Sequence, residues 1–313
     1  MKTKANSSAA RIQDFGALIA LILLVVAISI ISPEFRTGGN FLSLLRQSSI
    51  NGLIAFGMTC VILTGGIDLS VGSVLALTTV LGAKMIAAGV AVPLSMIAAL
   101  ALGLGFGAVS GFLVTKGRLQ PFIATLITMT VYRGVTMIVS NGKPISGLGD
   151  SFALKFIGKG NVFGIPVPIW LLALVFLVVF FLLHKTTFGR RVYATGSNSR
   201  AAKLAGVNTH KTMLLVYALS GLLAALSGLI LLSRLNSAQP TLGEGYELDA
   251  IAAAALGGTS MTGGRGKIYG TLIGVLIIAV LNNGLNILGI SSYYQDVIRG
   301  LVILVAVLSD RKR

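Results

Sequence analysis

Residues 165–183 read IPVPIWLLALVFLVVFFLL, a run without a single charged side chain. The residues that follow, 185–212, contain six Lys or Arg and neither Asp nor Glu. A helix needs about 20 apolar residues to cross the hydrocarbon core of a bilayer, and loops rich in Lys and Arg are retained on the cytoplasmic side. The stretch therefore predicts a transmembrane helix over 165–184 that leads into a cytoplasmic loop over 185–212.

Apolar runs of this kind recur along the whole chain. We place the other nine at 15–31, 47–64, 70–89, 92–114, 121–140, 213–233, 246–258, 268–288 and 293–309. Those at 47–64, 70–89 and 246–258 are short or interrupted by glycine. The sequence predicts an all-α polytopic membrane protein with about ten transmembrane helices, some broken by glycine-rich segments, in a single transmembrane domain over 1–313.

Basic residues outside the runs predict the orientation. Besides 185–212, they cluster at both termini and after the fourth and eighth runs: Lys2, Lys4, Arg11, Lys116, Arg118, Arg265, Lys267, Arg311, Lys312 and Arg313. With ten spans and a cytoplasmic N-terminus, all five clusters lie on the cytoplasmic side. We therefore expect cytoplasmic tails over 1–14 and 310–313. The external loop over 141–164 is then either a docking surface or a solvated connector.

Composition excludes several other classes of protein. The chain is 55% hydrophobic and 11% charged, whereas soluble domains carry about 25% charged residues. Its net charge of +16 lies in short loops and at the ends, which fits membrane orientation rather than a nucleic-acid-binding face. A single cysteine, Cys60, excludes a disulfide framework. Continuous apolar runs exclude a transmembrane β-barrel, whose strands alternate, and no P-loop motif or metal-binding cluster is present.

Small residues predict where helices approach closely. Glycines recur at every fourth position in 103–111 and in 266–274, and Gly221 with Ala225 forms a further small pair. Two polar segments interrupted by glycine, 65–73 and 256–264, are weakly similar to each other. Corresponding breaks in two halves of a transporter point towards the substrate path.

Polar and charged residues within the runs are candidates for a translocation path, because such groups are costly in lipid. The candidates are Asn51, Asp68, Ser70, Gln120, Thr125, Glu247, Asp249, Asn282, Asn283 and Asn286. Hydrogen bonding between helices is the alternative role for each of them. For Asp68 the alternatives are a gate at a broken helix and a structural cap. Asp296 and Arg299 are three residues apart, and we expect a structural pair.

The cytoplasmic loop contains the most informative motif. Residues 189–208 read GRRVYATGSNSRAAKLAGVN. This sequence predicts a short helix over 199–205, with Asn198 or Ser197 as N-cap and Gly206 at its end. A short exposed helix between two spans has little apolar surface of its own, so it is expected to pack on a partner.

The loop resembles the coupling segment of permease subunits in bacterial ABC importers of the branched-chain amino acid and monosaccharide group. The resemblance implies that Gly196, Asn198, Arg200, Ala201, Ala202, Gly206 and Val207 contact an ATPase. Ser199 and Arg200 stand where the family often has an acidic residue. Residues 64–76, 237–253 and 281–295 resemble the ribose-transporting members, although xylose, arabinose, galactose and autoinducer-2 permeases share some of these motifs.

The family resemblance implies a transport subunit and not an enzyme. Two copies would form the pathway in the bacterial inner membrane, and a cytoplasmic ATPase with two nucleotide-binding halves would bind ATP and Mg. A periplasmic sugar-binding protein would deliver the sugar, and no cofactor is expected in this chain. Two alternatives remain: a stand-alone secondary transporter, which would carry coupled ionisable groups, and a membrane enzyme, for which no catalytic set stands out.

Overall fold

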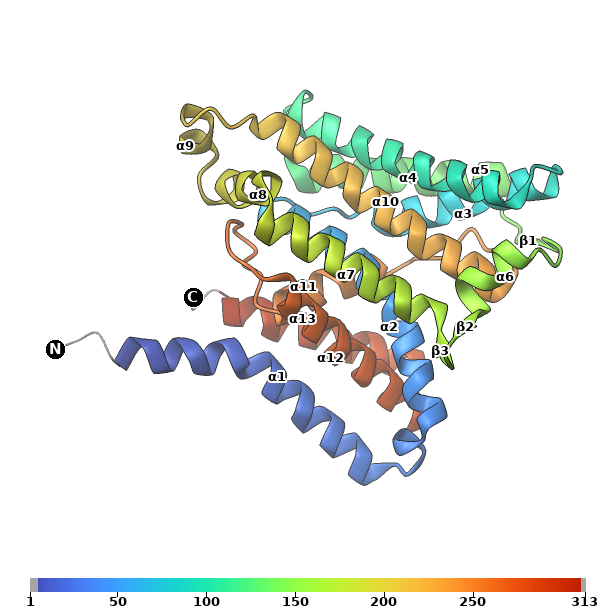
Figure 1. Cartoon of the computed structure of the whole chain (residues 1–313), viewed down its shortest axis with the longest axis horizontal. Helices are drawn as coiled ribbons and strands as arrows, with labels where there is room; N and C mark the ends of the chain where they lie inside the picture. Colours follow the sequence, from blue (N-terminus) through green and yellow to red (C-terminus); the bar gives the residue numbers. More distant parts are fainter. Residues whose placement is uncertain (1–4, 311–313) are drawn as a thin grey trace.

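Each of the ten predicted runs coincides with one helix in the computed structural model, which describes residues 5–310 (Figure 1). In chain order these helices are α1 (Ala5–Ile31), α2 (Gly38–Leu63), α3 (Val71–Ala87), α4 (Val92–Thr115), α5 (Pro121–Ser140), α7 (Val167–Lys185), α10 (Thr209–Leu235), α11 (Tyr246–Leu256), α12 (Ile268–Ile287) and α13 (Ser292–Asp310). Proline in the first turn of α4, α5 and α7 marks where each begins, since its missing N–H is not needed there.

Short elements fill the connections. They are η1 (Glu34–Arg36), α6 (Phe152–Lys159), α8 (Thr187–Ser197), α9 (Ser199–Leu204) and the two-residue strands β1 (Ile145–Ser146), β2 (Asn161–Val162), β3 (Ile165–Pro166) and β4 (Ser237–Ala238). Strand β1 pairs antiparallel with β4, and β2 with β3. Helix α1 begins inside the predicted 1–14 tail. The parts of the two predicted tails at residues 1–4 and 311–313 lie outside the described part of the chain.

The chain is an all-helical, multi-pass membrane protein. Five helices, α4, α5, α7, α10 and α12, are long and apolar enough to cross a bilayer on their own. Helix α2 is long but is buried along its second half among α7, α10, α11 and α12, so it tolerates polar side chains. Helix α11 is too short to cross a bilayer, since its 11 residues rise only about 16 Å. Ten crossings therefore remain a prediction.

The predicted small-residue ridges pack helices together within the chain. Helix α4 crosses α10 so closely that a Cβ at Gly107 would collide with the carbonyl oxygen of Tyr217. A Cβ at Gly274 on α12 would likewise collide with the carbonyl of Ala253 on α11. These contacts confirm the prediction of close approach. Large apolar side chains on α4, α5 and α7 remain exposed and form a surface suited to lipid, among them Ile97, Phe112, Ile138 and Phe181.

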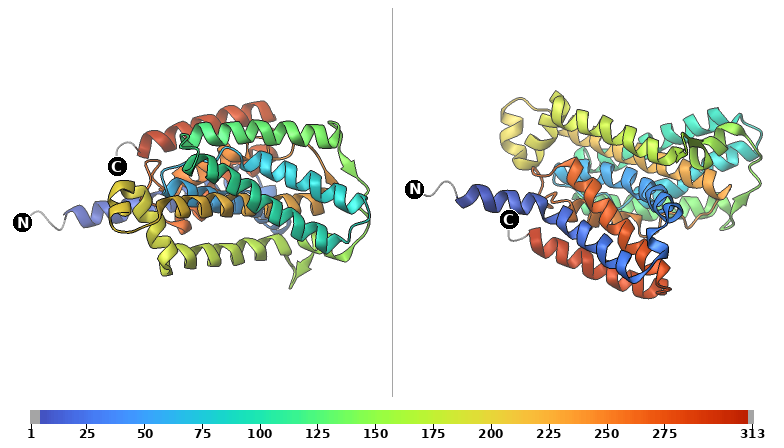
Figure 2. Two further views of the ribbon diagram at one scale, coloured as in Figure 1. Left: turned by 90° about the horizontal axis from the view of Figure 1, so that it is seen from above. Right: turned by 60° about the horizontal axis from the view of Figure 1, so that its bottom comes forward.

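The two ends of the bundle differ. Helices α8 and α9 lie at one end, together with the beginning of α1 and the end of α13, and all views keep them there (Figures 1 and 2). Helix α6 and strands β1, β2 and β3 lie at the opposite end (Figure 1). The predicted cytoplasmic loop and the predicted external loop are thus separated by the length of the bundle.

Candidate functional site

A polar cavity of about 450 Å³ lies between α2, α10, α11, α12 and α13. Its lining is Ser43, Leu44, Gln47, Asn51, Arg234, Glu244, Tyr246, Asp249, Ala279, Asn282, Asn283, Asn286, Gln295 and Arg299. Five of the ten path candidates from the sequence therefore come together here: Asn51, Asp249, Asn282, Asn283 and Asn286. The size falls within the range of small-molecule sites, about 300–1,000 Å³. Amides and charges dominate its lining.

Asp249 joins three helices at the wall of this polar cavity. It lies in the first turn of α11 and is only 4% exposed. Its carboxylate lies 3.0 Å from Nε of Arg299 on α13 and accepts a 3.4 Å hydrogen bond from Nδ2 of Asn51 on α2. Arg299 also contacts Asp296 at 3.5 Å, as expected. The ion pair with Asp249 was not expected, because nothing in the spacing links residues so far apart.

Other lining groups are paired with each other. Asn283 and Asn40 exchange two amide hydrogen bonds, of 2.8 and 3.0 Å, between α12 and α2. The side chain of Gln295 donates to Asn286 at 2.9 Å, and Arg234 donates to Gln47 at 3.1 Å. Five further lining residues were not among the candidates from the sequence: Gln47, Arg234, Glu244, Gln295 and Arg299. The signal that marked the other candidates, a polar side chain inside an apolar run, is also present at Gln47, Gln295 and Arg299.

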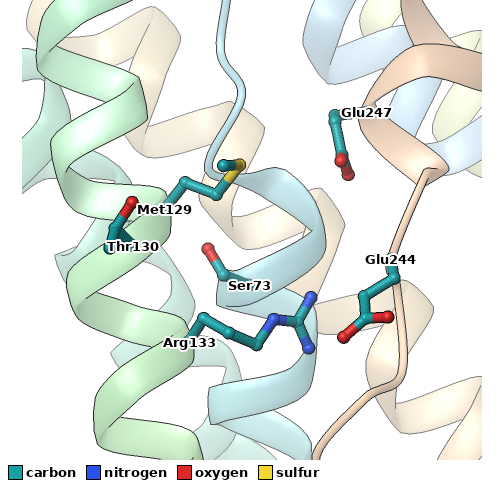
Figure 3. A pocket seen from close by; sticks show the side chains of 6 residues that line it. All are labelled: Ser73, Met129, Thr130, Arg133, Glu244 and Glu247. Atoms are coloured by element: carbon teal, nitrogen blue, oxygen red, sulfur yellow. The ribbon is translucent and has the colours of Figure 1, made fainter.

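A second cavity of about 260 Å³ adjoins the first at Glu244, which lines both. Ser73, Met129, Thr130, Arg133 and Glu247 complete its lining. Arg133 reaches from α5 past Ser73 towards Glu244 (Figure 3). It donates hydrogen bonds of 2.7 and 3.0 Å to the carbonyls of Pro240 and Leu242. Arg133 therefore holds the segment 240–245 that carries Glu244 into position before α11.

The remaining path candidates lie elsewhere. Asp68 is buried before α3, where it accepts hydrogen bonds from the Ser70 N–H at 3.0 Å, the Ser70 hydroxyl at 2.6 Å and the Ser220 hydroxyl at 2.8 Å. Thr125 donates to the carbonyl of Ile67 at 3.0 Å. These bonds anchor the broken segment to α10 and α5, which favours the structural role for Asp68. Gln120 is exposed at the beginning of α5, away from both cavities.

Helix α9 is capped at both ends as its sequence predicts. The side chain of Asn198 accepts a 3.0 Å hydrogen bond from the N–H of Ala201. At the other end Gly206 has φ +83°, and the N–H groups of Gly206 and Val207 donate to the carbonyls of Lys203 and Ala202. This pair of bonds is a Schellman motif. Caps at both ends hold so short a helix, because only Ala202 on it is buried.

Four glycines join the loop to the bundle, and we call them the glycine junction: Gly65, Gly196, Gly263 and Gly264. The N–H of Gly264 donates to the carbonyl of Leu63 at 2.9 Å. A Cβ at Gly263 would lie 2.8 Å from the nitrogen of Gly65 and 3.3 Å from Cα of Gly196. The two weakly similar segments interrupted by glycine, 65–73 and 256–264, therefore meet at the end of α8.

Tyr193 adds a second bond at the same place. Its hydroxyl, on α8, donates to the carbonyl of Gly266 at 2.9 Å. The loop 257–267 runs directly from α11, whose first turn carries Glu247 and Asp249. Helix α11 thus begins at the two cavities and leads, through this loop, to the glycine junction.

The chain is similar to known proteins along almost its whole length. Residues 40–307 match the family described as branched-chain amino acid transport system / permease component. The chain is 56% identical over 301 residues to the ribose import permease protein of Bacillus subtilis (strain 168), covering 96% of this chain and 94% of that protein. Identity to the ribose import permease protein of Escherichia coli (strain K12) is 52% over 304 residues, covering 96% and 95%. Identity to the D-allose transport system permease protein of the same strain is 40% over 301 residues, covering 96% and 92%. No solved structure matches the chain.

Proposed function

Because the chain belongs to the family of branched-chain amino acid transport system permease components, we propose that it is the membrane-spanning permease subunit of an ABC importer for ribose. The observation that carries the choice of sugar is the fall in identity, from 56% and 52% for the two ribose permeases to 40% for the D-allose permease. The subunit moves sugar and performs no chemistry, since ATP and Mg bind to the partner ATPase.

Ribose passes the polar cavity on its way through the subunit. A pentose is a set of hydroxyl groups, and the cavity supplies amides and charges that hydrogen-bond to hydroxyls. Asn51 on α2 and Asn282 on α12 face this space from two different helices. Glu244 connects it to the second cavity. Asp68, Ser70 and Thr125 shape the broken segment, and Gln120 has no place on this path.

The partner ATPase docks on α8 and α9. The support is an apolar side chain on the outside of a capped helix, Leu204, which is 91% exposed. Arg200 and Lys203 flank it on the same short helix and are exposed too. An exposed leucine with basic side chains beside it fits the apolar centre and polar rim of a protein interface. At the beginning of the docking segment, Gly196 packs so closely on the bundle that a Cβ would collide with the carbonyl oxygen of Leu63. At the other end, the N–H of Val207 closes α9 by donating to the carbonyl of Ala202.

The remaining partners follow from the two ends of the bundle. With α8 and α9 in the cytoplasm, the beginning of α1 and the end of α13 lie on the same side. The chain then crosses the inner membrane ten times, and one of these crossings combines the short helix α11 with the irregular segments that flank it. Helix α6 and strands β1–β3 then face the periplasm, where a sugar-binding protein delivers ribose. A second copy of the chain completes the pathway. Coupling requires two conformations that differ in affinity for the ATPase states and for the loaded binding protein.

ATP-dependent uptake of labelled ribose tests the function. The assay uses vesicles that contain this chain with its ATPase and binding protein, and xylose, galactose and D-allose as competitors. We expect uptake that requires all three components and resists the competitors. Uptake of another sugar would keep the architecture and change the substrate. Uptake without the ATPase would establish the alternative, a secondary transporter.

A further inference from the structure

Most of the amide and charged side chains that line the polar cavity are already paired with another side chain. Hydrogen bonds join Asn283 to Asn40, Asn286 to Gln295 and Gln47 to Arg234, and Asp249 forms an ion pair with Arg299. A donor or acceptor that is engaged in this way must break its bond before it can bind a sugar hydroxyl. These pairs therefore build the wall of the cavity and hold the helices together.

Two amides in the lining keep polar atoms that no hydrogen bond engages. The Oδ1 atom of Asn51 is buried and has no hydrogen-bond partner among the described residues. The same amide donates through Nδ2 to Asp249, which fixes its orientation and leaves Oδ1 as an acceptor. The side chain of Asn282 is half-buried in the lining, and no hydrogen bond joins it to any group in residues 5–310.

An acceptor buried without a partner is unfavourable, because it has lost its bonds to water. Such an atom in a polar cavity indicates a ligand or a water molecule that completes its bonding. Asn51 Oδ1 can accept a hydrogen bond from a sugar hydroxyl, whereas the Asn282 amide offers both a donor and an acceptor. Together they match the alternating donor and acceptor character of sugar hydroxyls.

We propose that Asn51 and Asn282 are the residues of this subunit that contact the sugar during its passage, an inference that rests on the proposed ribose transport. Two contacts among so many polar groups give weak binding. A transport path needs this, since a site must bind well enough to admit its substrate and weakly enough to release it. The paired groups around them keep the two amides in place without adding affinity.

Equilibrium binding of labelled ribose tests the proposal. The permease–ATPase complex is placed in lipid nanodiscs without the binding protein, and binding is measured for the natural chain and for N51L, N51Q, N282L and N282Q. We expect weak saturable binding by the natural complex. Each leucine variant should weaken it about 3- to 10-fold, the size of one lost hydrogen bond, and each glutamine variant should weaken it less.

Thr78→Val is the matched control, because it removes a hydroxyl that bonds only to its own helix, at Val74 and Leu75. Co-purification of the ATPase shows that each variant is folded, and N282S replaces any leucine variant that fails this check. Unchanged binding by the folded variants would overturn the proposal, as would a natural complex that binds no ribose. In either case ATP-dependent uptake by the natural importer would still stand and would uphold the proposed function.

Discussion

At Gly206 a single residue closes α9 and begins the return to α10. Its φ of +83° is strained for any residue with a side chain. No atom lies within 4 Å of the position that a Cβ would take, so the strain is conformational and not a collision. Asn198 at the other end is as local, since its bond spans three residues. Both caps were predicted from the sequence because each depends on a few neighbouring residues.

Replacing Gly206 by Asp is expected to abolish ATP-dependent ribose uptake while the protein stays in the membrane fraction. The substitution strains the end of α9 by about 1 kcal/mol or more and adds a negative charge to the docking segment. Uptake by membrane vesicles and immunoblotting of the membrane fraction are the measurements. Gly89→Asp is the matched control, with φ +85° and open space in the α3–α4 turn. Normal uptake by the Gly206 variant would contradict the coupling role.

Two short helices, α9 and α11, link the proposed docking surface, the glycine junction and the cavities. Helix α9 presents Leu204 outwards and contacts the rest of the chain through few residues. Helix α11 packs along α12 and α2, with its first turn at the cavities, and the loop after it reaches the glycine junction. The short length of α11 makes this possible, since a full span could not begin inside the bundle. Irregular backbone at that depth is tolerated where it lies against protein or water.

At α9, Leu204→Asp should release the ATPase. The side chain is 91% exposed in the isolated subunit, so the change costs the fold little but places a charge in a buried interface. We expect co-purification of the ATPase to fall at least 10-fold, corresponding to about 1.4 kcal/mol or more. Leu204→Met, which keeps the apolar contact, should retain it. Full recovery of the ATPase with the Asp variant would place the docking surface elsewhere.

At the junction between α8 and α11, Tyr193→Phe removes only the hydroxyl that bonds to Gly266. The lost hydrogen bond amounts to about 1 kcal/mol, which loosens the link without preventing assembly. We expect more ATP to be hydrolysed per ribose imported, measured as the ratio of the two rates in the same vesicles. Tyr269→Phe, a neighbouring aromatic on α12, is the control. An unchanged ratio in the Tyr193 variant would show that coupling takes another route.

In the whole molecule, two exposed aromatic or aliphatic side chains lie at opposite ends of the helical bundle. Phe163, in the turn between β2 and β3, is 94% exposed, and Leu204 is 91% exposed. Cys60 is fully buried, so a thiol reagent added to the folded protein should not reach it. The chain is therefore suited to mapping which end faces which compartment.

Single-cysteine labelling should show Phe163→Cys outside and Leu204→Cys inside. In spheroplasts, a membrane-impermeant maleimide is expected to label the Phe163 variant directly and the Leu204 variant only after permeabilisation. The unchanged chain, with Cys60 alone, measures the background. If both variants react in intact spheroplasts, the orientation given by the positive-inside rule is wrong.

The sequence by itself determined the helix positions, the all-helical membrane class and the caps of α9. Each depends on hydropathy, charge or hydrogen bonds read over a few adjacent residues. Only the tertiary structure decided which polar residues meet. Asp249 with Arg299, Asn40 with Asn283, and Gly65 with Gly263 are distant in the chain. Their pairing depends on how the helices pack, since no local pattern constrains it, and for the same reason Asp68 and Gln120 fell outside the cavity.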